Sequence, residues 1–260
     1  MNNARCAIEA LVALEPIKVW SLIITLFGDR SAKGASVALS GKQIRGLLEH
    51  IGVKADTTRV ALHRLKKEGW ITTAKHGREV AYRLSDHGCT QTASAYDDVY
   101  RQSVKYETGW KLQLSLQETG AFLPGAMPVL RNIVLLPEEA QDTHSDNMDL
   151  SLVAADVPPW FVNLVLPPKH LAIAEGYLQI VANLGPVIEC SAELDKSALR
   201  LLIVHHWRKM ALRNSTWFHI WVDEQGAFGA CHRWVMTLLL GSLYRRPDNA
   251  ISVSVCDHGE

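Results

Sequence analysis

Residues 55–84 read ADTTRVALHRLKKEGWITTAKHGREVAYRL, and the hydrophobic pattern changes its period in the middle of this stretch. In the first half, small and apolar residues have the spacing of one buried helical face: Thr58, Ala61, Leu62 and Leu65. We expect Asp56 to cap the start of this helix and Gly69 to end it. The other side of the helix would then carry basic residues: Arg59, His63, Lys66 and Lys67.

The second half alternates between apolar and polar residues, which is typical of a β-hairpin. One strand would start near Ile71 and the other would end at Leu84, with the connection at residues 76–79. Gly77 can adopt the positive φ angle that a tight turn needs. We therefore expect a hairpin with a basic tip that carries Lys75, His76 and Arg78.

A second amphipathic helix precedes this unit. Ser40-Gly41-Lys42-Gln43 is a capping box, in which the serine and glutamine side chains each accept one free backbone N–H. The apolar residues that follow share one helical face: Ile44, Leu47, Leu48 and Ile51. Gly52 and Val53 would form the turn. Helix, tight turn, basic helix and hairpin, in this order, are typical of a winged helix-turn-helix domain.

Local charge supports a nucleic-acid partner for this segment. Residues 41–88 contain ten Lys/Arg and five Asp/Glu, a local excess of +5 in a chain whose formal net charge is zero. Affinity for DNA comes largely from neutralising phosphates, so a basic excess on one domain indicates local DNA binding. The alternative is a solvated helix face with no partner.

The expected DNA contacts fall into three groups. Contacts to base edges are expected from Thr57, Arg59 and His63. Contacts to phosphates, which position the protein without specifying sequence, are expected from Lys42, Arg45, Lys66 and Lys67. Contacts from the hairpin tip are expected from His76, Gly77 and Arg78. Ordinary surface charge is the competing interpretation of each lysine.

The rest of the chain carries its own periodic segments. Short alternating or apolar runs at 110–116, 132–136 and 150–154 predict three strands of a small ferredoxin-like α/β domain. Helical periodicity at 169–183, 198–212 and 230–244 predicts a mainly helical C-terminal part. The prediction is a multidomain α+β protein, divided into a winged-helix domain (1–88, with 1–15 as a lead-in), a linker helix (89–109), a middle domain (110–157) and a C-terminal effector and dimerisation domain (158–260).

Composition places the chain among soluble globular proteins. No apolar run has the roughly eighteen residues of a membrane span, and the N-terminus does not resemble a secretory signal. The five cysteines are scattered and form no CxxC pair, which indicates reduced thiols in a cytoplasmic protein. The Gly-rich phosphate-binding motifs and the GxSxG nucleophile motif do not occur, so we expect no catalytic residue and no resident cofactor.

With these segments placed, the chain resembles the PaaX family, the repressors of bacterial phenylacetic acid degradation. The matching stretches are WSLIITLFGDR, RVALHRLKKEGWITTAKHGREVAYRLSDHG, LLIVHHWRKMALRN and SLYRR. The resemblance implies a winged-helix domain, a Cas2-like α/β middle domain and a helical C-terminal domain. It also implies a homodimer that binds palindromic double-stranded operator DNA. The middle segment AFLPGAMPVLRNIVLL departs from the family pattern.

The resemblance further implies a small-molecule effector, since phenylacetyl-CoA releases the founding repressor from DNA. Because the middle segment differs, an acyl-CoA or a related catabolic intermediate is the broader expectation. Candidate ligand-binding residues are His205, Arg208 and Arg213. His205 and His206 are adjacent and therefore lack the i, i+4 spacing of a helical zinc pair, so we expect no metal site and a packing role for His206.

Three functions of different classes remain open. The first is a ligand-responsive transcriptional repressor. The second is a metal-dependent nucleic-acid-processing enzyme that uses the Cas2-like domain, for which the acidic candidates are Asp146, Asp149 and Asp156. The third is a scaffold whose winged helix binds protein. The basic excess of residues 41–88 favours the first over the third.

Overall fold

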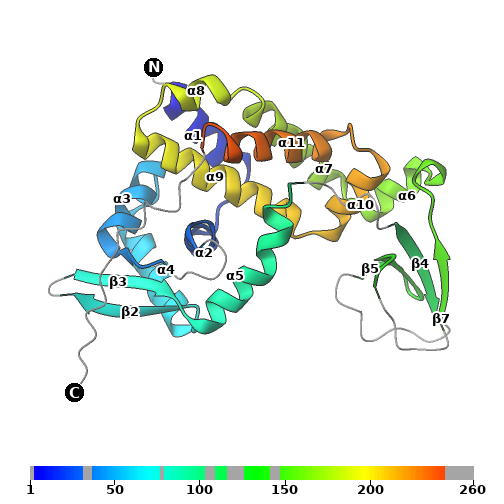
Figure 1. Cartoon of the computed structure of the whole chain (residues 1–260), viewed down its shortest axis with the longest axis horizontal. Helices are drawn as coiled ribbons and strands as arrows, with labels where there is room; N and C mark the ends of the chain where they lie inside the picture. The colour runs from blue at the N-terminus through cyan, green and yellow to red at the C-terminus, as the bar shows by residue number, and fades with distance from the viewer. Residues whose placement is uncertain are drawn as a thin grey trace.

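The computed structural model describes residues 3–31, 37–76, 79–102, 109–115, 126–140 and 147–243. These residues form an α+β protein with two small antiparallel sheets. Most helices pack into one body, and the second sheet stands at one end of it (Figure 1). Residues 251–255, whose alternation of apolar and polar residues predicts a terminal strand, lie outside the described residues.

The helix α2 (Val19–Arg30) lies at the centre of the N-terminal half, where Figure 1 shows it end-on. Leu22, Ile23 and Phe27 are fully buried, because α4, α5 and α9 pack around this helix. The helix α1 (Asn3–Leu14) packs against α7 and α9 and buries Ile8 and Leu11. The expected lead-in is therefore a packed helix and part of the core.

The two helices predicted for this region are present as α3 (Gly41–Ile51) and α4 (Ala55–Lys67). The capping box is confirmed, because Gln43 N donates to Ser40 Oγ at 3.1 Å and Ser40 N donates to Gln43 Oε1 at 2.8 Å. Gly52 has a φ of +101° after α3, which only glycine adopts without strain. Asp56 is not the N-cap; α4 begins at Ala55 after an extended Lys54, and Asp56 lies in the first turn.

The predicted hairpin is also present, as β2 (Ile71–His76) and β3 (Glu79–Leu84). The two strands are antiparallel, with Ile71 opposite Leu84. A short strand, β1 (Leu39–Ser40), pairs with β3 and makes this a three-stranded sheet in the order β1-β3-β2. Residues 77–78 of the tip lie outside the described residues.

The helix α5 (Asp86–Val99) follows the hairpin directly, and it is shorter than the linker helix expected over 89–109. Ser85 caps its start, since Gly88 N donates to Ser85 Oγ at 3.0 Å. Gly88 lies against the carbonyl oxygen of Trp70, where an added Cβ would come within 2.3 Å. The hairpin and α5 are thus held at a close backbone contact that only glycine permits.

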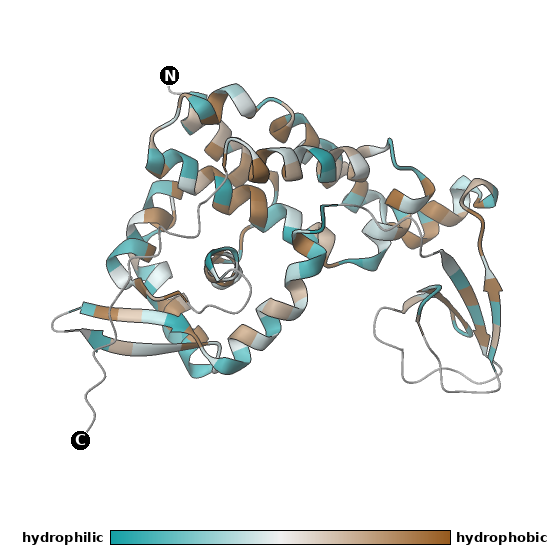
Figure 2. Ribbon diagram, viewed as in Figure 1, coloured by the Kyte–Doolittle hydropathy of each residue, from teal (hydrophilic) through white to brown (hydrophobic). Residues whose placement is uncertain are grey.

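The second sheet consists of β4 (Trp110–Ser115), β5 (Met127–Leu130), β6 (Ile133–Pro137) and β7 (Asn147–Ser151), in the order β5-β6-β4-β7. The third strand was expected at 150–154, but the strand ends at Ser151 and Ala154–Asp156 form the 3-10 helix η2. The reason is the pairing of β7 with β4, which begins at Asn147 opposite Ser115. Apolar and polar residues alternate along β7 (Figure 2).

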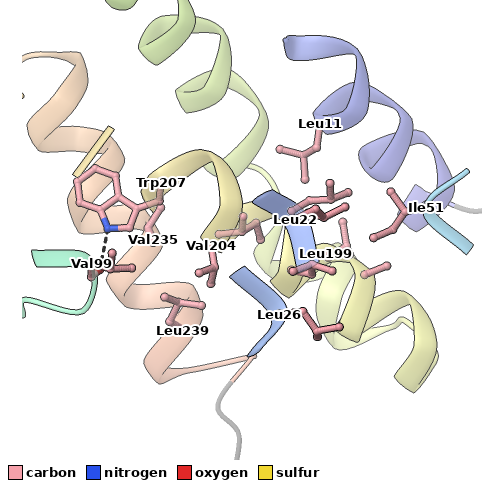
Figure 3. Packing of buried hydrophobic residues seen from close by; sticks show 14 of the residues in the cluster. Leu11, Leu22, Leu26, Ile51, Val99, Leu199, Val204, Trp207, Val235 and Leu239 are labelled. Carbon is pink, nitrogen blue, oxygen red and sulfur yellow. Dashed lines mark hydrogen bonds between the residues drawn. The ribbon is translucent and has the colours of Figure 1, made fainter. Parts of the chain in front are cut away.

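Six α-helices follow in the described residues up to 243: α6 (Pro159–Val165), α7 (Pro168–Val181), α8 (Gly185–Glu189), α9 (Glu193–Ala211), α10 (Asn214–Val222) and α11 (Ala227–Leu240). The helix α9 contacts α1, α2, α3, α7 and α11. One continuous hydrophobic core therefore joins N-terminal side chains such as Leu22 and Leu26 to Leu199 and Val204 of α9 (Figure 3).

Candidate nucleic-acid interface

The helix α4 has one buried face and one exposed basic face. Thr58, Ala61, Leu62 and Leu65 are buried, as the spacing predicted. The residues expected to reach DNA from this helix are all exposed: Thr57, Arg59, His63, Lys66 and Lys67. The two expected phosphate contacts on α3, Lys42 and Arg45, are exposed as well.

A groove of about 450 Å³ separates α3, the start of α4 and the strand β3. Lys42 and Arg45 line it from α3, and Arg59 lines it from α4. Glu79 and Val80 line it from β3. The fold thus brings together three of the predicted basic residues, while His63, Lys66 and Lys67 lie farther along α4.

Arg59 forms an ion pair with Asp56 one turn earlier, at 3.2 Å between Nη2 and Oδ1. Both side chains are strongly exposed, so the pair contributes little to stability and is easily exchanged for another partner. In contrast, the exposed Arg64 is bound by Glu68 at 2.7 Å and lies over the ring of Trp20 at 5.9 Å. Arg59 is therefore the less restrained of the two arginines on α4.

The predicted contacts at the hairpin tip are described only in part. His76 ends β2, whereas Gly77 and Arg78 lie outside the described residues, so their contribution stays a prediction.

The sequence analysis did not single out Val60, which is 63% exposed on α4 between Arg59 and His63. Its position outside the apolar stripe at 58, 61, 62 and 65 is the signal that could have found it.

The predicted ligand residues, two on α9 and one directly before α10, lie in different surroundings. His205 is buried against α2, with its Nδ1 3.2 Å from Thr25 Oγ1, and burial lowers its pKa to about 3. Arg208 lines a cavity of about 300 Å³ between α2, α5 and α9. Arg213 is partly buried at the start of α10 and does not line this cavity. Ligand binding by these residues stays a prediction, and His206 is buried in the core as expected.

The structure describes two of the three acidic residues considered for metal chemistry, Asp149 and Asp156. Asp149 accepts hydrogen bonds from Lys111 Nζ at 2.7 Å and Gln113 Nε2 at 3.0 Å. Asp156 lies in η2, and Asp146 is outside the described residues. No cluster of three or more His, Cys, Asp or Glu side chains suited to a metal occurs among the residues that the structure describes.

Among the described residues, no helix is both long and apolar enough to cross a membrane.

Comparison with known proteins gives one family and one relative of known role. The model of the family described as PaaX-like protein matches residues 18–88. The transcriptional repressor PaaX of Escherichia coli (strain K12) is 28% identical over 249 residues, which cover 82% of this chain and 77% of the repressor. A solved structure, an uncharacterized protein from Mycobacterium tuberculosis, aligns with a TM-score of 0.46 and 12% identity over 86% of this chain and 96% of that one. The family match over residues 18–88 and the similarity to the repressor along most of the sequence confirm the predicted resemblance to the PaaX family.

Proposed function

We propose that this protein is a ligand-responsive transcriptional repressor that binds operator DNA through α3, α4 and the β2–β3 hairpin. This unit would act as a winged helix-turn-helix, with α4 as the recognition helix in the major groove. The proposal agrees with the named relative, which is a transcriptional repressor. Such a protein would act in the bacterial cytoplasm.

The observation that carries the proposal is that α4 has one buried apolar face and one exposed basic face. Its apolar stripe is buried by the protein, so the helix is held rigidly, while its other face presents Arg59, His63 and Lys66 to solvent. A fixed helix with an exposed basic face is what insertion into a groove about 12 Å wide requires. The basic residues of α3 flank this face across the groove that Lys42 and Arg45 line.

The exposed residues would make different kinds of contact with the DNA, according to the chemistry of each side chain. Arg59 would pair with a guanine, and Thr57 and His63 would contact neighbouring base edges. Val60 would pack against a thymine methyl group, which is the contact that an exposed aliphatic side chain on a recognition helix can make. Lys42, Arg45, Lys66 and Lys67 would neutralise phosphates, and His76, Gly77 and Arg78 would reach the backbone or minor groove from the hairpin.

The remainder of the molecule would dimerise and respond to the effector. A homodimer places two recognition helices on two half-sites, so the operator would be palindromic, with half-sites one helical turn or a multiple of it apart. Residues 110–157 would form the Cas2-like middle domain, and residues 158–260 the C-terminal domain. We propose an acyl-CoA or related catabolic intermediate as the effector, acting by favouring a spacing of the recognition helices that does not fit DNA.

Binding to the DNA upstream of the protein's own gene tests the proposal. A gel-shift titration at moderate salt with excess nonspecific competitor should retard this fragment and leave a scrambled fragment of equal length free. Footprinting should then show a protected site with two-fold symmetry. Equal affinity for the two fragments would refute sequence-specific binding, and a protected site without symmetry would refute the dimer.

A further inference from the structure

The cavity between α2, α5 and α9 has a composition suited to a small ligand. Its volume of about 300 Å³ is at the lower end of the range of roughly 300–1,000 Å³ that ligand pockets occupy. Ile24, Val99, Val204 and Leu212 give it apolar walls. Two aromatic rings, those of Tyr96 and Tyr100, line it from α5 with their centroids 4.5 Å apart.

Arg208 places a positive charge at the edge of this apolar space. Its guanidinium is held by α2, since Nε donates to Thr25 Oγ1 at 3.1 Å and Nη2 donates to Ser21 Oγ at 2.7 Å. Among the described residues no carboxylate lies within ion-pair distance of Arg208, and its Nη1 donates to none of them. Burial lowers the pKa of this guanidinium, as expected for a cation that has lost water without gaining an anion.

Arg200, which lies on the same helix as Arg208, is by contrast a guanidinium with a carboxylate partner. Arg200 donates to both carboxylate oxygens of Asp29, at 2.7 Å and 2.6 Å, and to the carbonyl oxygen of Leu243 at 2.8 Å. The hydroxyl of Tyr100 also donates to Asp29, at 2.6 Å. The carboxylate of Asp29 is thus paired with Arg200 and Tyr100. Arg208 can therefore form an ion pair with an anion that comes from outside the protein.

We propose that this cavity binds a small organic acid with an apolar, preferably aromatic, body and that its carboxylate pairs with Arg208. The guanidinium is pre-positioned by two hydroxyl groups, so the acid would gain a charge-assisted hydrogen bond without ordering a long side chain. The tyrosine rings would pack against the apolar body. The volume suits a free acid and not a whole nucleotide-bearing thioester, so the expected ligand differs in chemistry from a CoA ester.

The cavity also touches the segment that joins the recognition helix to the hairpin. Trp70 lines it, and Trp70 N donates to Leu65 O of α4 at 2.9 Å. The carbonyl oxygen of Trp70 accepts from Ser85 N at 3.0 Å, directly before α5. A ligand that packs between α9, α5 and Trp70 would therefore favour one position of α4 relative to the C-terminal helices. This regulatory consequence rests on the proposed function, whereas binding of the acid does not.

Calorimetric titration of the full-length protein with sodium phenylacetate and sodium benzoate tests the binding claim, with phenylacetamide as the neutral match and phenylacetyl-CoA as the large thioester. Loss of the charge-assisted contact should weaken binding of the amide about tenfold or more. Ala95→Leu should fill the cavity and abolish binding, because Ala95 lines it. Ala93→Leu, at an exposed position of the same helix, should change the affinity by no more than about twofold.

Two arginine variants test the role of the cation. Arg208→Gln should weaken binding of the acids about tenfold or more, while Arg233→Gln, at an exposed arginine of α11 outside the cavity, should leave it within about twofold. Equal affinity for acid and amide, wild-type binding by Ala95→Leu, or binding of the thioester alone would each overturn the proposal. The first comparison uses the wild-type protein, so it holds even if a variant fails to fold.

DNA binding by the ligand-free protein separates the two claims. If the operator is bound and the acids are not, the cavity assignment fails and the proposed function stands. If the acids bind in the cavity and no operator is bound, the proposed function fails and the site remains. A change in operator affinity with phenylacetate that Ala95→Leu removes would support the regulatory link.

Discussion

The indole Nε1 of Trp207 in α9 donates a hydrogen bond of 2.8 Å to the backbone carbonyl oxygen of Val99, the last residue of α5 (Figure 3). Both residues are buried. The bond joins the helix that follows the hairpin to the central helix of the C-terminal half. Because a helix end leaves its last carbonyl groups without intrahelical partners, Trp207 supplies a partner that α5 lacks.

Trp207→Phe tests the contribution of this bond. The substitution keeps an aromatic ring in the core but leaves the carbonyl oxygen of Val99 buried without a donor. We expect the free energy of unfolding to fall by about 1–3 kcal/mol, measured by urea denaturation. Trp160→Phe is the control, because Trp160 is exposed and its replacement should change stability by less than about 0.5 kcal/mol.

The ion pair of Asp29 and Arg200 gives a second prediction. Both side chains are nearly buried, and the pair connects α2 to α9. Asp29→Asn should lower the free energy of unfolding by about 3–5 kcal/mol, because it leaves a buried guanidinium without its anion. Glu68→Gln, which removes an exposed partner of Arg64, should cost no more than about 1 kcal/mol.

A double-mutant cycle distinguishes the pair from simple packing loss. Asp29→Asn combined with Arg200→Met should cost less than the sum of the two single changes, since the second removes the uncompensated charge that the first creates. Additive losses in urea denaturation would show that the two residues stabilise the protein independently.

The local parts of the fold could be predicted from the sequence. The capping box of Ser40 and Gln43 depends on two residues three positions apart, and the stripe on α4 depends on a single helical period. The hairpin register follows from alternation and the short connection. The N-cap differs from the expected Asp56, because the chain enters α4 one residue earlier, at Ala55, and this acidic residue lies in the first turn.

The cavity and the central role of α9 could not be predicted in this way. Arg208 and its partner Ser21 are 187 residues apart, and Thr25 is 183 residues away. From its helix alone, Arg208 was equally consistent with a solvated face. His205 likewise has a partner in α2, so its neutral, buried state depends on packing between segments that no local pattern connects.

Acid should destabilise the protein partly through Glu15. Its hydrogen bond with His206, together with the charge of Lys209, lowers the pKa of Glu15 from 4.5 to about 2. The folded state therefore prefers the carboxylate, and this stabilisation is present above pH 4.5 and is lost as the pH falls toward 2. Linkage gives a contribution of about 3 kcal/mol.

Glu15→Gln should remove this part of the pH dependence. Stability measured between pH 5 and 2, about the window of this titration, should fall less steeply in the variant than in the wild-type protein. His205, whose pKa burial lowers to about 3, destabilises both proteins as the pH falls from 6.5. The charge of Glu15 has only the smallest effect on that pKa, so most of this contribution cancels in the difference. Glu9→Gln, at an exposed carboxylate paired with Arg5, should keep the wild-type profile. Parallel curves for wild type and Glu15→Gln would contradict the assignment.

Arg59 and Lys66 lie on the same exposed side of α4 but should affect DNA binding differently. Arg59→Ala should cost about 1–3 kcal/mol on the operator and relax the preference at one base pair, because a bidentate contact to guanine is lost. Lys66→Ala should weaken operator and nonspecific DNA alike and reduce the slope of log K against log salt by about 1, since one phosphate contact is lost. Fluorescence anisotropy over a salt series on the operator and on single-base variants measures both quantities. The same response from Arg59→Ala and Lys66→Ala would refute the division between base reading and phosphate contact.

Val60→Ala should lower affinity for operators that carry thymine at one position and leave the salt slope unchanged, because the contact is apolar.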